Sequence, residues 1–122
     1  MTDRHLIRLQ WPAKALWPNG GRGHRMAHHR ATKSAKNEAF YAAKAAGVKP
    51  GDHPPHLIVT HYPKTANTPD KDNCIAAFKA RQDGLAMALS VNDRDLTSEH
   101  HIGEPVKGGC VLVEVVATEA PA

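Results

Sequence analysis

Three aspartates in the second half of the chain have a spacing that could bring their carboxylates to one divalent cation. Asp70 and Asp72 are two residues apart, and Asp93 follows 21 residues after Asp72. Side chains two residues apart share one side of an extended backbone, and Asp93 could join them if the chain folds back. Mg²⁺ takes oxygen ligands and can activate a water for attack on a phosphodiester. The spacing predicts a magnesium site for phosphodiester hydrolysis.

The same aspartates also have a simpler interpretation. An Asp-x-Asp pair commonly supplies a helix cap and a turn residue, and Asp93 beside Asn92 is typical of a turn. None of these elements is specific alone. Their occurrence together, in one order along the chain, favours the metal site.

Two lysines are candidates for stabilising charge on a phosphate in such a site. Lys79 lies seven residues after Asp72, which on a helix is the same face, about 10 Å further along. Its alternative is a surface ion pair with Asp83, at a spacing of four residues. Lys71 lies between the two acids in sequence and could serve instead.

Basic residues are concentrated in the first third of the chain. Residues 4–37 contain no acid, although the net charge of all 122 residues is only +4. A solvated basic face is the simpler interpretation, but self-repelling charge favours a polyanion as its partner. The candidates for contacts with DNA phosphates are Arg22, Arg25, Arg30, Lys33, Lys36 and Lys71.

The nine histidines and two cysteines follow no recognisable zinc-ligand spacing. Adjacent histidines such as His100 and His101 would point to opposite faces of a strand. A zinc-binding structural or regulatory protein is therefore a weaker alternative. With two thiols in no such spacing and no long apolar run, we expect a cytoplasmic protein with reduced cysteines and no membrane partner.

The elements that must position these residues form a small α/β domain. Hydrophobic residues make up 41% of the chain, enough for one modest core. Period-two and helical patterns predict a mixed sheet packed with two helices, in one domain over residues 1–122. Strands are expected at 5–11, 57–62, 96–102 and 110–116, and helices at 32–46 and 72–89, with Asp72 or Asn73 as the second N-cap and a loop over 13–25.

The residues in the catalytic segment, 70–95, resemble a known family. Asp70-Lys71-Asp72-Asn73, then Lys79 to Leu85, then Asn92-Asp93 is similar to the pattern of the RusA family of Holliday-junction resolvases, frequent in phages. The basic N-terminal segment, 4–37, is also similar to that family. The resemblance covers about residues 5–116, but its specific motifs lie between Asp70 and Asp95.

The resemblance implies a homodimeric α/β endonuclease that resolves four-way DNA junctions in recombination and repair. It implies that Asp70, Asp72 and Asp93 bind Mg²⁺, or Mn²⁺ in its place, and that Lys79 is needed for catalysis. A two-fold dimer would present two equivalent sites for two matched nicks. Asn92 stands where the family often has an aspartate. That difference keeps open a catalytically inactive DNA-binding accessory protein with the same fold.

Overall fold

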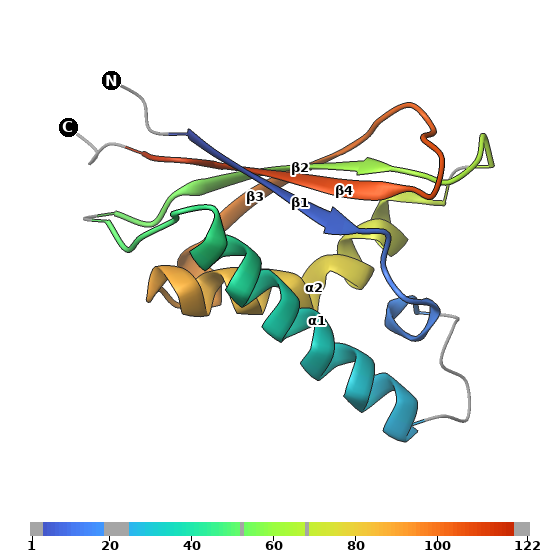
Figure 1. Cartoon of the computed structure of the whole chain (residues 1–122), viewed down its shortest axis with the longest axis horizontal. Coiled ribbons are helices and arrows are strands. Elements are labelled where there is room, and N and C mark those ends of the chain that lie inside the picture. Colours follow the sequence, from blue (N-terminus) through green and yellow to red (C-terminus); the bar gives the residue numbers. More distant parts are fainter. Residues whose placement is uncertain (1–3, 19–24, 52, 68, 119–122) are drawn as a thin grey trace.

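The computed structural model describes residues 4–18, 25–51, 53–67 and 69–118 (Figure 1). Their order confirms the predicted alternation of strand, helix, strand, helix, strand, strand. The elements are β1 (Arg4–Gln10), a 3₁₀ turn η1 (Lys14–Leu16), α1 (Arg25–Ala45), β2 (His56–Tyr62), α2 (Lys71–Leu89), a 3₁₀ turn η2 (Asp93–Asp95), β3 (Thr97–Ile102) and β4 (Cys110–Val116).

The four strands form one mixed sheet in the order β1-β4-β2-β3. β4 pairs antiparallel with β1 and β2, whereas β2 and β3 are parallel neighbours connected through α2. Burial alternates along β2, where Leu57, Val59 and His61 are fully buried. Both helices lie on the face to which these side chains point, and no described helix covers the other face (Figure 1). The predicted α/β domain is therefore confirmed.

The first helix is longer than the sequence analysis predicted. It begins at Arg25, although a start at Thr32 was expected and residues up to 25 were assigned to a loop. Residues 25–31 contain no glycine or proline, and the partly buried Ala31 packs against the cluster that contains Leu16. This contact beside η1 supports the first two turns, because packing stabilises a helix more than propensity does.

The second helix begins slightly earlier than predicted and ends where expected. Asp70 is its N-cap residue by backbone conformation, where Asp72 or Asn73 was predicted, and Lys71 is the first helical residue. The helix ends at Leu89, and Ser90 takes a left-handed conformation with a φ of 57°. The amide of Ser90 donates to carbonyls of the last turn, which closes the helix.

A glycine contact and a buried ion pair fix α1 against α2. A Cβ added to Gly84 would lie 2.1 Å from the Lys36 carbonyl oxygen and 3.2 Å from the Ala39 Cβ, so only glycine allows this approach. Nearby, Arg81 is 2% exposed, and its guanidinium donates to Glu38 at 2.8 Å and 3.0 Å. Together these contacts fix the position of α2 along and against α1.

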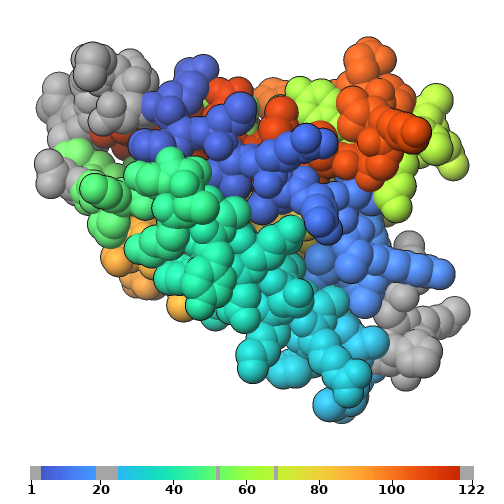
Figure 2. All heavy atoms as spheres, viewed as in Figure 1, coloured from blue at the N-terminus to red at the C-terminus, as the bar shows by residue number. Residues whose placement is uncertain are grey.

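The two helices run in the same direction and begin at the same end of the molecule (Figure 1). Ala35 of α1 clusters with Ala77 and Ala80 of α2, and four residues further along α1, Ala39 meets Gly84. In Figure 2, α1 forms an exposed ridge along the face in view. Within the described residues, no helix is both long and apolar enough to cross a membrane.

Candidate metal and nucleic-acid site

Asp70 and Asp72 lie at the N-terminus of α2, just beyond the carboxyl end of β2. The Asp70 backbone is extended, with φ −63° and ψ 145°, and its carbonyl accepts the Cys74 amide at 3.1 Å. Its side chain makes no capping hydrogen bond to the helix. Both carboxylates are exposed. The simpler interpretation of this pair, in which the aspartate side chain caps the helix, is therefore wrong for Asp70.

The N-terminus of α2, where the aspartate pair lies, can bind anions as well as cations. The first amides of α2 and the helix dipole favour negative charge at this end, which stabilises Asp72 in the first turn. Lys71 is exposed between the two acids. A site of this kind presents two carboxylate ligands and one ammonium group within a single helical turn.

Two stacked histidines are buried between the sheet and the N-terminal half of α2. His61 of β2 and His100 of β3 join through His61 Nε2 and His100 Nδ1 at 2.9 Å, and Phe78 packs edge-on against both rings. Burial, then the neighbouring charges of His100 and Arg81, lower the pKa of His61 to about 4. Burial, then the charge of Lys71, lowers the pKa of His100. Both imidazoles are therefore neutral near pH 7.

Sequence reasoning missed this histidine pair. The signal was available, because His61 falls in the buried phase of β2 with Leu57 and Val59. The prediction that His100 and His101 face opposite ways is confirmed, since His100 is buried and His101 is exposed. Cys74 is buried too, and burial, then Asp70, raises the pKa of its thiol, so it is not a reactive thiolate.

Asp93 does not join Asp70 and Asp72 within one chain. It is the first residue of η2, beyond the far end of α2, and the 19 residues of that helix span about 28 Å. The expected fold-back does not occur, because β2 and β3 are parallel and α2 must carry the chain back to the edge where β2 begins. Among residues 4–18, 25–51, 53–67 and 69–118, no three His, Cys, Asp or Glu side chains are placed to hold a metal ion.

The two candidate lysines differ in their distance from the aspartate pair. Lys79 is exposed, two turns along α2 from Asp72, as its spacing predicted. It does not form the alternative ion pair with Asp83, although both side chains lie in the described part of α2. Lys71 is adjacent to both acids, so within one chain it is the nearer cation.

The predicted DNA contacts lie mainly on α1. Arg25, Arg30 and Lys33 are exposed and Lys36 is half-buried, and all four lie on α1. Arg25 was expected in the preceding loop, and it is instead the first residue of the helix. Arg22 lies outside the described residues. In Figure 1 both helices begin on the same side of the molecule, but the start of α1 lies further from the sheet than the start of α2.

A second group of titratable side chains lies on the open face of the sheet. His56 Nε2 lies 2.9 Å from one Glu99 oxygen, and His101 Nε2 lies 2.6 Å from the other. Thr97 Oγ1 lies 2.7 Å from His56 Nδ1. These bonds from His56 and His101 lower the pKa of Glu99. The arrangement therefore contains one carboxylate and two imidazoles that are already hydrogen-bonded to it.

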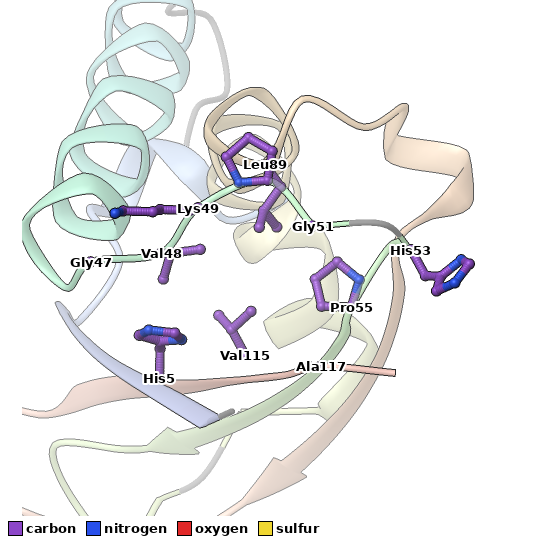
Figure 3. A pocket seen from close by; sticks show the side chains of 11 residues that line it. His5, Gly47, Val48, Lys49, Gly51, His53, Pro55, Leu89, Val115 and Ala117 are labelled. Carbon is purple, nitrogen blue, oxygen red and sulfur yellow. The ribbon is translucent and has the colours of Figure 1, made fainter. Parts of the chain in front are cut away.

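One hollow lies at the other end of the molecule from Asp70. It has a volume of about 430 Å³ and is bounded by the end of α1, the start of β2 and the end of α2 (Figure 3). His5, Lys49 and His53 line it beside Leu89 and Val115, and its described lining includes no carboxylate. It therefore offers a basic and apolar surface rather than a second acidic site.

Comparison with known proteins shows a similarity to a bacterial protein. The chain is 35% identical over 114 residues to an uncharacterized protein of Xylella fastidiosa, across 89% of this chain and 74% of that protein. No protein-family model matches the chain.

Proposed function

We propose that this chain, which belongs to the same family as the Xylella fastidiosa protein, is a metal-dependent endonuclease that nicks branched DNA. The observation that carries the proposal is the exposed pair Asp70 and Asp72, whose side chains stand at a helix N-terminus with Asp70 not used as a cap. An N-cap aspartate that gives up its capping bond forgoes about 1 kcal/mol, which favours another role for the carboxylate.

The donor set fits Mg²⁺, or Mn²⁺ in its place. Mg²⁺ is usually held by one or two carboxylates, with waters and substrate phosphate filling the other positions. Asp70 and Asp72 would supply those carboxylates from an open surface that a DNA backbone can approach. When bound, the ion would activate a water and stabilise charge on the leaving oxygen.

The chain's own cations would position the phosphate beside the aspartates. Lys71, which lies between the two acids in sequence, would share a phosphate with the Asp70–Asp72 pair, and Lys79 would contact the DNA strand further along α2. Arg25, Arg30 and Lys33 on α1 would bind the flanking backbone by charge. A homodimer would present two such surfaces, one for each of two matched nicks in a four-way junction.

The test compares the rates at which wild type, Asp70→Asn and Asp72→Asn nick a labelled four-way junction in the presence of Mg²⁺. We expect each variant to lose at least about 100-fold in nicking rate, while junction affinity stays within about threefold. Asp95→Asn is the matched control, because Asp95 is an exposed aspartate on η2 that we assign no role. Equal nicking by wild type and both variants would refute the assignment.

The second candidate is a DNA-binding accessory protein without nuclease activity. Asn92, where the resolvase pattern often has an acid, favours it, as does the separation of Asp93 from the other two aspartates. This candidate predicts junction binding that is unaffected by Mg²⁺ or by Asp72→Asn, with no nick at any metal concentration.

A further inference from the structure

A hollow lined by both tryptophans of the chain lies beside the start of α2. Trp11 directly follows β1 and Trp17 directly follows η1, and their ring centroids are 5.5 Å apart. The other wall comes from the segment that connects β2 with α2 and ends at Pro69, directly before Asp70. The hollow has a volume of about 320 Å³. It therefore adjoins the exposed aspartate pair.

The two indole rings are held in place by the protein interior. Trp11 packs against the main hydrophobic core, and Trp17 packs against the smaller cluster that contains Leu16. Trp17 Nε1 donates to the Pro12 carbonyl at 3.3 Å. Gly109 lies so close to Trp11 that a Cβ there would be 3.1 Å from the ring atom Cδ2. Because each ring is still only half-buried, a preorganised aromatic surface stays open to a ligand.

Polar groups lie at the rim of this aromatic surface. Lys64, Thr65 and Asn67 are exposed and provide an ammonium group, a hydroxyl and a side-chain amide. The Lys64 stem is held beside Gly109, where a Cβ would be 3.0 Å from Lys64 Cγ. Among the residues that the structure describes, no carboxylate lines the hollow. The hollow thus combines a flat apolar surface with one cation and with groups that both donate and accept hydrogen bonds.

We propose that this hollow, the tryptophan pocket, binds one unpaired nucleobase of a DNA strand, an inference that rests on the proposed nuclease function. A base offers a flat π face to an indole, and its edge offers donors and acceptors to Thr65 and Asn67. Lys64 would bind a phosphate of the same strand. The volume of the pocket is at the lower end of the range for small-ligand sites, which suits one base rather than a duplex.

The tryptophan pocket would explain how the protein distinguishes branched DNA from linear duplex. In a duplex, both faces of a base are covered by its neighbours and its edge is paired, so no face is free for an indole. At a branch point the stacking is interrupted, and a base leaves the stack at a lower cost. Because the pocket ends directly before Asp70, the backbone next to the bound base would lie near the aspartate pair.

A proline-rich peptide is the other ligand that aromatic-lined grooves commonly bind. Two features of the pocket favour the nucleobase. Lys64 supplies a positive charge that suits a phosphate and that a neutral proline-rich segment does not need. The pocket also adjoins the aspartates that we assign to the chemistry on DNA. Direct binding separates the two ligands.

Intrinsic fluorescence tests the pocket, because the two tryptophans of the chain both line it. In EDTA, a single-stranded oligothymidylate should quench the emission by at least about 30%, because a base stacks on the indoles. A blunt duplex with the same number of nucleotides should bind by charge through α1 and change the emission by less than about 5%. A proline-rich peptide should leave the emission unchanged.

Variants at two positions separate stacking from packing. Trp17→Leu keeps an apolar side chain but removes the π face, and should weaken affinity for the labelled single strand at least about fivefold in fluorescence anisotropy. Trp17→Phe keeps an aromatic face and should stay within about threefold of wild type. Asn67→Ala, an exposed change that disturbs no packing, should weaken the same affinity at least about twofold. All three variants should bind the duplex as wild type does, and far-UV circular dichroism checks their fold.

Three results would overturn the tryptophan pocket. The first is an emission that strand and duplex change equally, and the second is equal strand affinity in Trp17→Leu and Trp17→Phe. The third is quenching by the proline-rich peptide and not by the strand, which would identify a protein partner instead.

The conditions keep the pocket and the nuclease apart. Every binding measurement is made in EDTA, so it decides the pocket even if wild type nicks no DNA. Conversely, a wild-type protein that nicks junctions but shows no quenching by the single strand would refute the pocket and leave the nuclease standing.

Discussion

Replacement of Gly84 by alanine tests the packing that places α2 and therefore the aspartate pair. The added Cβ would lie 2.1 Å from the Lys36 carbonyl oxygen, whereas ordinary contact begins at about 3.4 Å. The helices must therefore separate by about 1.3 Å, the difference between these distances, and the obstacle is backbone that cannot rotate away. Overpacking of this kind costs about 1–3 kcal/mol, against the gain of about 1 kcal/mol that alanine brings to a helix interior.

We expect Gly84→Ala to lower the free energy of unfolding by about 2 kcal/mol, measured by urea denaturation. The matched control is Gly51→Ala, where a Cβ meets nothing within 4 Å and φ is not positive. That change should be neutral or slightly stabilising, because it restricts only the unfolded chain. A Gly84→Ala protein as stable as the Gly51→Ala control would refute the close approach of α1 and α2.

Three further predictions follow from the candidate site. The pKa of His61 falls from 6.5 in the unfolded chain to about 4 in the folded one, so the unfolded state takes up the proton first. The contribution of His61 to the free energy of unfolding should therefore be constant above pH 6.5 and fall by up to about 3 kcal/mol between pH 6.5 and 4. His61→Gln should flatten that pH dependence in urea titrations; an unchanged profile would show that His61 is not the titrating group. Asp70→Ala should cost less than about 0.5 kcal/mol on thermal unfolding, because its side chain makes no capping bond, whereas a loss of 1 kcal/mol or more would show that it does cap. Lys33→Ala should reduce the slope of log affinity for DNA against log salt by about 0.9, and Lys49→Ala, at the opposite end of the molecule, should leave the slope unchanged.

The sequence predicted the elements well where local pattern and tertiary packing agree. β2 and β4 follow their alternation, and α2 ends at Leu89 as expected. α1 was placed seven residues too late, because its first turns are polar and gain support from Ala31 packing against a distant 3₁₀ turn. No pattern within residues 25–31 reports that contact.

The candidate site was predicted in part for a similar reason. The exposure of Asp70 and Asp72 at a helix N-terminus follows from local sequence. The distance to Asp93 depends on the parallel pairing of β2 and β3, which residue spacing does not reveal. The buried pair of His61 and His100 also needs the sheet order, since the two residues belong to strands that are far apart in sequence.

Metal-dependent nuclease activity is tested by cleavage of a labelled four-way junction beside a linear duplex of the same length, with Mg²⁺ and with EDTA. The proposed nuclease should make paired nicks at symmetric positions in the junction, dependent on Mg²⁺, and leave the duplex intact. Junction binding without any nick in Mg²⁺ or Mn²⁺ would contradict it and favour the accessory DNA-binding protein.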